Sequence, residues 1–186
     1  EIDAYQVTFP EGEQRTDAYK AMIPTVTVPS VWLDSGRVLS SVFAITQYLE
    51  ALYPARPLLG STAEERAVVL DWNHRIFNEV FRPTGDIFRN TNPAFAGRAL
   101  PGALDLEQIP ALAERGKAQL LFALTVLNSE LATREFVAGD AFTMADIDLL
   151  ALLHFAGWAT KTKPDDAMTG LHAWRERAQA TLDGTA

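Results

Sequence analysis

The 186-residue sequence has no cysteine, only three histidines and no long uninterrupted hydrophobic stretch. Without cysteine, these residues can supply no disulfide, no thiolate-bound metal and no cysteine nucleophile. His74, His154 and His172 do not show the spacing of a metal site, so we predict none. Apolar runs such as Leu149–Leu153 are far shorter than the roughly 20 residues that a membrane-spanning helix needs.

Basic residues are also scarce, with 16 Lys and Arg against 24 Asp and Glu and a formal net charge of −8. Nucleic-acid-binding domains are rich in clustered Lys and Arg, and an anionic membrane surface attracts positively charged proteins. We therefore expect neither nucleic acid nor membrane as a partner. A hydrophobic content of 48% excludes a mostly disordered chain.

The character of the sequence changes near Pro54–Pro57. Before this point, short β-like runs alternate with turn signals and short helical patterns. The turn residues Asp34-Ser35-Gly36 indicate a hairpin. The predicted elements are a strand over Ile2–Phe9, a helix over Thr16–Met22, hairpin strands over Val26–Leu33 and Arg37–Leu39, and a helix to Leu52 capped by Ser40 or Ser41.

After this point, nearly every segment follows a helical period. The segment Pro83–Pro110 is the exception, because its prolines and glycines predict an irregular connection, and loops of that length are often functional. The predicted helices cover Ala63–Phe81, Leu120–Leu131, a segment beginning at Thr143, and a segment through Met168–Ala178.

The opening strand has no partner of its own in the sequence. A parallel neighbour would require a preceding strand and a crossover helix, roughly 25–30 residues in all. We expect such a segment to precede Glu1.

Three separated stretches together resemble the glutathione S-transferases. The resemblance follows the chain in matching order, and the combination is more specific than any single motif. The stretches are Ile23–Pro29 with Leu33–Ser40, then Ala44-Ile45 with Tyr48–Glu50, and finally Val137-Ala138-Gly139-Asp140-Ala141-Phe142-Thr143-Met144-Ala145-Asp146.

The resemblance implies an α/β plus all-α architecture. A thioredoxin-like, glutathione-binding N-terminal domain, incomplete here, would span residues 1–54, and an all-helical C-terminal domain would span 63–186. It implies a cytoplasmic homodimer that uses glutathione as cosubstrate to conjugate or reduce a small electrophile in detoxification. The family's first strand and helix, with its catalytic Ser, Tyr or Cys, would precede Glu1, so the catalytic residue is unknown here.

By the same resemblance, Val28 and Pro29 bind glutathione, with a cis bond that turns the Val28 backbone toward the cysteinyl unit. Ser41 and Val42 stand where the family usually carries Glu-Ser, so only the Ser41 hydroxyl and the helix N-terminus remain for the γ-glutamyl group. A plain N-cap is the alternative for Ser41. Gln14 resembles a position that reaches the glycine carboxylate, Arg15 could do so by charge, and a solvated loop is the alternative for both.

The helix around Trp72 resembles the first C-terminal helix of bacterial members. His74 and Asn78 lie four residues apart and share a face, and Phe88 is the best candidate for an apolar pocket wall. We therefore predict that Trp72, His74, Asn78 and Phe88 bind the acceptor substrate. A solvated helix face and core packing are the alternatives.

Thr143 and Asp146 form a capping-box pattern, with Phe142 and Ile147 placed as a hydrophobic staple. We assign this motif to folding rather than to ligand binding. For the whole protein, the alternative to a transferase is a non-catalytic glutathione S-transferase-like binding or regulatory protein. The exchange of Glu-Ser for Ser41-Val42 favours that alternative.

Overall fold

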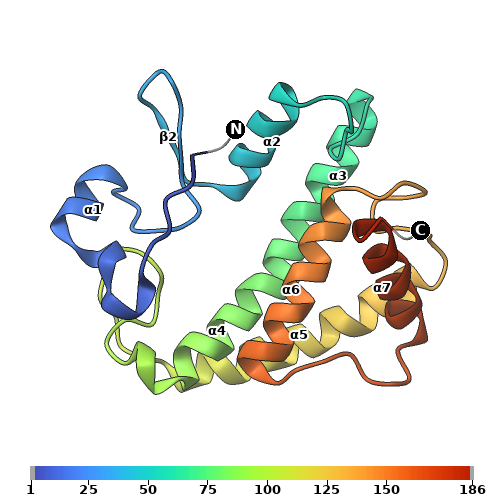
Figure 1. Cartoon of the computed structure of the whole chain (residues 1–186). Helices are drawn as coiled ribbons and strands as arrows, with labels where there is room; N and C mark the ends of the chain where they lie inside the picture. Colours follow the sequence, from blue (N-terminus) through green and yellow to red (C-terminus); the bar gives the residue numbers. More distant parts are fainter. Residues whose placement is uncertain (1–2, 185–186) are drawn as a thin grey trace.

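The computed structural model describes residues 3–184. Figure 1 shows the N-terminal helix and hairpin on one side of the molecule and the long helices on the other. The elements are η1 (Phe9–Glu11), η2 (Glu13–Arg15), α1 (Asp17–Met22), β1 (Val31–Trp32), β2 (Val38–Leu39), α2 (Val42–Leu52), α3 (Ala63–Ile76), η3 (Phe77–Phe81), α4 (Arg82–Thr91), η4 (Pro93–Phe95), α5 (Pro110–Leu131), α6 (Met144–Thr160) and α7 (Thr169–Leu182).

The strand predicted over Ile2–Phe9 is wrong for residues 3–9, and Ile2 lies outside the described residues. This segment is irregular and leads into η1, because the only sheet among the described residues pairs β1 with β2 and offers it no neighbour. A strand without a neighbour has no ladder of backbone hydrogen bonds. Val7 instead packs against Tyr19 and Ile23 in a small core of its own.

The predicted hairpin is confirmed, although its strands are shorter than the β-like runs. Val31 pairs with Leu39 and Trp32 with Val38 in antiparallel register. Gly36 adopts φ +78°, and its N–H donates to the Leu33 carbonyl at 2.8 Å to close the turn. The helix that follows is also confirmed as α2, with Ser41 at its N-cap position.

The irregular segment predicted from Pro83 is wrong over its first part, since α3, η3 and α4 form one continuous rod (Figure 1). A proline inside a helix lacks an N–H and clashes with the carbonyl four residues earlier. The π-turn η3 resolves this conflict just before Pro83, where the Arg82 N–H donates to the Phe77 carbonyl five residues back. The wider turn lets the rod continue to Thr91.

The main core lies between α3, α5, α6 and α7. It includes Leu120, Leu124 and Leu127, each at most 1% exposed, as the helical period over Leu120–Leu131 predicts. That helix begins ten residues earlier than predicted, at Pro110, because proline is well suited to the first helical turn.

The capping box at the start of α6 is confirmed, with Thr143 and Asp146 bonded reciprocally. Asp146 is fully buried and also accepts from the Val137 amide at 2.9 Å and the Trp174 indole at 2.8 Å. The motif therefore joins the loop before α6 to α7, which agrees with a role in folding. Among residues 3–184 no helix is long and apolar enough to cross a membrane, and no cluster of three metal-binding side chains occurs.

Candidate functional site

The backbone N–H groups in the first turn of α2 donate no hydrogen bond to any side chain among the described residues. Ser41 has extended angles, φ −107° and ψ 128°, and its hydroxyl accepts no hydrogen bond from the helix. The first N–H groups of a helix have no intrahelical acceptor, so those beginning at Val42 keep their donors for another group. Ser41 and Val42 are both exposed. Together with the helix dipole, this end of α2 favours a carboxylate.

Val28 lies in the turn between α1 and β1. Its bond to Pro29 is cis, as the resemblance implies, and Val28 is 41% exposed. The neighbouring carbonyl of Thr27 accepts hydrogen bonds from the hydroxyls of Tyr19 and Ser30, both at 3.1 Å. Since Tyr19 is buried, these bonds anchor the turn and leave the Val28 backbone open to an extended ligand.

Gln14 and Arg15 belong to η2 and have different surroundings. The Gln14 Oε1 atom is buried and has no hydrogen-bond partner among the described residues. Arg15 pairs instead with Asp105 in the loop before α5, with 2.5 Å between Nη2 and Oδ1. The charge of Arg15 is therefore already matched, whereas the Gln14 side chain keeps an unused acceptor oxygen.

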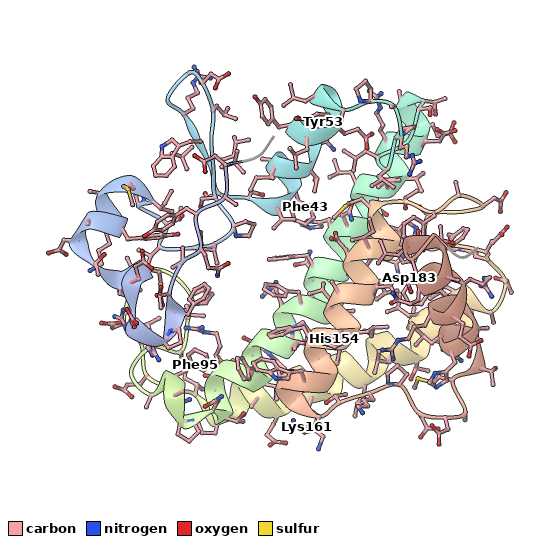
Figure 2. The ribbon with its side chains drawn as sticks, in the orientation of Figure 1. Phe43, Tyr53, Phe95, His154, Lys161 and Asp183 are labelled. Atoms are coloured by element: carbon pink, nitrogen blue, oxygen red, sulfur yellow. The ribbon has the colours of Figure 1, made fainter. Side chains whose placement is uncertain are left out.

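An aromatic row runs from the start of α2 along η3, α4 and α6. Neighbouring ring centroids in it lie 5.1–6.2 Å apart, within the range of favourable aromatic pairs. Figure 2 labels its two ends, Phe43 on α2 and Phe95 beyond α4. Trp158 is 61% exposed, an unusual state for so large an apolar ring. The members of the aromatic row are Phe43, Phe77, Phe81, Phe88, Phe95, Phe155 and Trp158.

The π-turn η3 shapes the middle of this row. It holds Phe77 and Phe81 with their centroids 5.2 Å apart, and both remain more than one-third exposed. A polar edge runs beside them: the Asn78 amide donates to the His74 carbonyl at 2.9 Å, and Arg82 donates to Asn78 Oδ1 at 3.3 Å. The predicted residues His74 and Asn78 therefore lie on the same helical turns as Phe77 and Phe81.

Trp72 does not lie with the other predicted acceptor residues. It is only 6% exposed and belongs to the main core. The guanidinium carbon of Arg75 lies 4.1 Å from its ring centroid, and that of Arg134 lies 5.2 Å away. Trp72 is therefore a core residue, whereas Phe88 is part of the aromatic row.

Sequence reasoning did not select the pair formed by Asn73 on α3 and Asp148 on α6. The Asn73 amide donates to Asp148 Oδ2 at 2.6 Å. Burial raises the pKa of Asp148 to about 6, and the hydrogen bond from Asn73 opposes that rise. Asn73 lies one turn before Phe77 and Asp148 two turns before Phe155, so the pair joins the two helices that carry the aromatic row.

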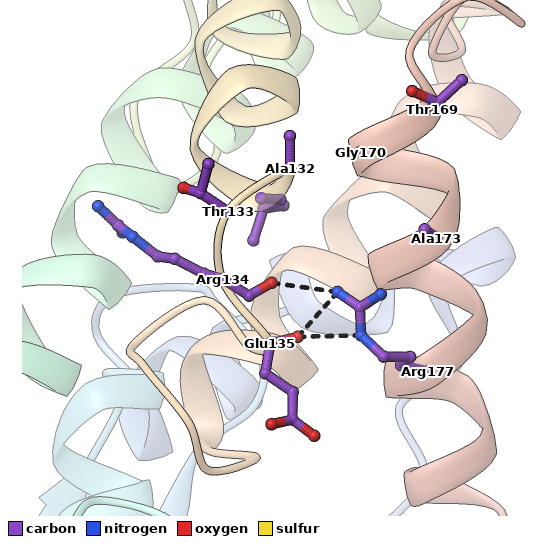
Figure 3. A pocket seen from close by; sticks show the side chains of 9 residues that line it. Ala132, Thr133, Arg134, Glu135, Thr169, Gly170, Ala173 and Arg177 are labelled. Carbon is purple, nitrogen blue, oxygen red and sulfur yellow. Dashed lines mark hydrogen bonds between the residues drawn. The ribbon is translucent and has the colours of Figure 1, made fainter.

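A hollow lies elsewhere, between the end of α5 and the start of α7 (Figure 3), with a volume of about 640 Å³. The Arg177 guanidinium donates to the carbonyls of Arg134 at 3.1 Å and of Glu135 at 3.1 and 3.2 Å. These hydrogen bonds satisfy backbone carbonyls just after the end of α5. They give Arg177 a structural task, and none of the predicted site residues lines this hollow.

Comparison with known proteins places the chain in a family. A sequence profile of the glutathione S-transferase C-terminal domain matches residues 110–177. Glutathione S-transferase 2 of Saccharomyces cerevisiae is 31% identical over 178 residues, which are 96% of this chain and 74% of that protein. The chain belongs to the glutathione S-transferase family.

Two further comparisons extend this result. A glutathione S-transferase domain-containing protein from Marinobacter aquaeolei VT8 superposes with a TM-score of 0.82 at 33% identity, covering 97% of this chain and 84% of that one. Elongation factor 1-gamma of Schizosaccharomyces pombe is 34% identical over 143 residues, which are 77% of this chain but 32% of that protein. Transferase-family sequences thus also occur within longer proteins.

Membership confirms three expectations from the sequence: the family, the thioredoxin-like plus all-helical fold, and a glutathione transferase as the class of enzyme. Family membership alone identifies neither the substrate nor the individual binding residues. Sequence reasoning missed Phe43, Phe77, Phe155 and Trp158. Their only early signal is aromatic spacing, such as the four residues from Phe77 to Phe81, which core packing explains equally well.

Proposed function

We propose that this transferase binds glutathione through residues 1–54 and holds an electrophilic acceptor against residues 63–186. One observation carries the proposal: the exposed helix terminus and the aromatic row begin at the same place. Val42 supplies a free N–H at the first position of α2, and the next residue, Phe43, contacts Phe77 with 5.9 Å between ring centroids. A polar, anion-binding end therefore adjoins an apolar surface.

Three contacts would hold the peptide. The γ-glutamyl carboxylate accepts from the first amides of α2 and from the Ser41 hydroxyl. The cysteinyl unit pairs with the exposed backbone of Val28, which Pro29 turns outward, in the manner of an added strand. The side-chain NH2 group of Gln14, rather than its buried oxygen, donates to the glycyl carboxylate, while Arg15 stays with Asp105. The two carboxylates thus lie at opposite ends, with the cysteine between them.

The reaction uses the thiolate of the bound cysteine as nucleophile. Its sulfur donates an electron pair to an electrophilic carbon, a sulfur–carbon bond forms, and the leaving group departs with the electrons of its own bond. Phe77, Phe81 and Phe88 would provide the apolar wall for the acceptor. His74 and Asn78 lie along its polar edge, where they can orient a polar substituent.

Replacing Val42 by proline tests the helix terminus without removing the helix. Proline is favourable at the first helical position, and Ser41 already has the extended angles that precede proline. The variant therefore loses one N–H donor and little else. A hydrogen bond to a charged group contributes about 1.5–3 kcal/mol, so calorimetry should find glutathione binding weakened by about tenfold or more.

Ala63→Pro is the matched control, because it removes the first amide of α3, which follows the extended cap residue Thr62. It should leave glutathione affinity unchanged. Equal affinity of Val42→Pro and the parent, with both folded, would overturn the placement of the carboxylate. Absence of glutathione binding by the parent itself at millimolar concentration would overturn the proposed function.

A second candidate is a non-catalytic binding or regulatory role. It is favoured by Val42, whose side chain cannot form the hydrogen bond that a polar residue would, and by the similarity to elongation factor 1-gamma. The two candidates differ in one result. A transferase accelerates thioether formation between glutathione and an aryl halide such as 1-chloro-2,4-dinitrobenzene, and a binding module does not.

We also propose that the protein forms a homodimer. Large apolar side chains near the end of α2 and on the outer face of α3 are exposed: Leu52 by 52%, Tyr53 by 59% and Leu70 by 48%. Exposed apolar groups of this size are typical of association surfaces. Sedimentation velocity on the parent and on Tyr53→Glu should show a dimer that the substitution weakens, and a monomeric parent would contradict it.

A further inference from the structure

An ion pair joins the N-terminal and C-terminal parts of the chain at the turn that carries Gln14. Arg15 of η2 donates through Nη2 to Asp105 Oδ1 at 2.5 Å, and Asp105 lies 90 positions later in the chain. Asp105 belongs to residues 96–109, which form a bridging loop between η4 and α5 (Figure 1). The bridging loop also approaches the segment before the Val28 turn, where Gly102 lies close to the Thr25 carbonyl. It therefore contacts the N-terminal part near the proposed glycyl end of glutathione.

Side chains of α4 fasten both ends of the bridging loop. At its far end, the Asn90 side-chain oxygen accepts from the Ile109 N–H at 2.8 Å. A backbone hydrogen bond to the Leu106 carbonyl, at 2.8 Å, holds the residue next to Asp105. At the near end, the Arg89 guanidinium donates at 2.6–2.9 Å to three consecutive carbonyls, those of Arg98, Ala99 and Leu100. Long irregular loops are often mobile, but these bonds give the Asp105 carboxylate a defined place.

The turn η2 depends on polar contacts, because packing contributes little to it. None of its three residues is buried, and a 3₁₀ turn of this length has few hydrogen bonds of its own. On one side of Gln14, the Glu13 carboxylate accepts from the Thr8 N–H at 2.6 Å. On the other side, Arg15 is bonded to Asp105. Gln14 therefore lies between two anchored residues, and one of the two anchors comes from the C-terminal part.

Building on the proposed function, we propose that Asp105 is a positioning residue for glutathione. It acts through Arg15, which it holds in place, and so fixes η2 with the Gln14 NH2 group directed at the glycyl carboxylate. A group that is already ordered binds a ligand at a lower entropic cost than a mobile group. The C-terminal part thus takes part in binding the peptide as well as the acceptor. The effect of Asp105 is confined to the glycyl end, because the other two units of glutathione bind at α2 and Val28.

The test compares glutathione with γ-glutamylcysteine, which keeps the first two units but lacks the glycyl unit. Binding of each peptide to the full chain is measured by calorimetry, and the parent should bind glutathione more tightly. Asp105→Asn removes the charge of the ion pair at nearly constant side-chain shape. Because exposed ion pairs are modest in strength, we expect this variant to bind glutathione about threefold more weakly and γ-glutamylcysteine as the parent does. A merely structural role of Asp105 would weaken both peptides alike.

Glu107→Gln is the matched control, because it removes an equal charge from the same loop. Glu107 is exposed and forms no ion pair with any residue between 3 and 184, so both affinities should stay unchanged. Asp105→Glu keeps the charge and should retain most of the preference for glutathione. Adding Arg15→Gln to Asp105→Asn should cause no further loss, since the two side chains act as one pair.

The outcomes separate this inference from the proposed function. If the parent binds glutathione but Asp105→Asn leaves its affinity unchanged, or weakens both peptides alike, the role of Asp105 is wrong and the proposed function stands. Tighter glutathione binding by Asp105→Asn, or a further loss in the double variant, would also overturn it, because Arg15 itself would then bind the glycyl carboxylate. If the parent binds neither peptide at millimolar concentration, the proposed function is wrong, and the inference fails with it.

Discussion

Asp148 provides a test of the electrostatics beside the aromatic row. Its carboxylate is largely buried and bonded to the Asn73 amide at 2.6 Å, and burial raises its pKa from 3.8 to about 6. Between these two pH values the folded chain holds a proton that the unfolded chain has released. Stability from this group is therefore fully present below pH 3.8 and is lost as the pH rises through about 6.

The size of the effect follows from the same values. Each pKa unit corresponds to about 1.4 kcal/mol, so ionising Asp148 costs the folded state at most about 3 kcal/mol. Because part of the side chain reaches solvent, we reduce this to about 1–2 kcal/mol. Asp148→Asn keeps an oxygen that accepts from Asn73 but cannot ionise. The variant should therefore gain about 1–2 kcal/mol over the parent between pH 4 and pH 7.

Urea denaturation of both proteins at pH 4, 5, 6 and 7 measures this difference. Asp71→Asn, an exposed position on α3, is the matched control and should show no comparable trend across this range. A stability difference between Asp148→Asn and the parent that is constant with pH, or a variant that becomes relatively less stable as the pH rises, would show that the pKa of Asp148 is not raised.

Two further predictions concern the helical core. Thr143→Ala removes the hydroxyl that caps α6 and should cost about 1 kcal/mol in urea denaturation; a midpoint equal to that of the parent would contradict the capping role. Gly170→Ala would drive a Cβ atom into the backbone carbonyl of Asn128, where two helices meet closely. It should lower Tm by several degrees, whereas Gly85→Ala, which has open space at the Cβ position, should not.

Local signals were sufficient for much of this fold. The hairpin at Gly36 and the capping box at Thr143 depend on residues close together in sequence, and both are present. The opening strand failed because a strand depends on a neighbour that its own residues cannot reveal. The helix break at Pro83 failed for a related reason, because the π-turn before it changes which carbonyl the proline approaches.

The site was less accessible to sequence reasoning, because its groups come together from distant elements. Phe88 was selected, but its contact with Phe155 joins α4 to α6 across 67 positions and leaves no local pattern. Asn73 and Asp148 likewise look like ordinary polar residues in the sequence, because their hydrogen bond exists only where α3 packs on α6. Trp72 shows the opposite error, because it was predicted to bind the acceptor but its side chain lies in the core. His74, two residues later on the same helix, is exposed.

In the proposed site, glutathione extends from the start of α2 past the Val28 turn to Gln14. Titration of the ¹⁵N-labelled chain with glutathione, followed by amide chemical shifts, tests it most directly. We predict the largest shifts at Val28, Val42 and Phe43, with smaller ones at Phe77. If the largest shifts fall instead at the hollow around Arg177, or if no amide shifts at millimolar glutathione, the proposed glutathione site is wrong.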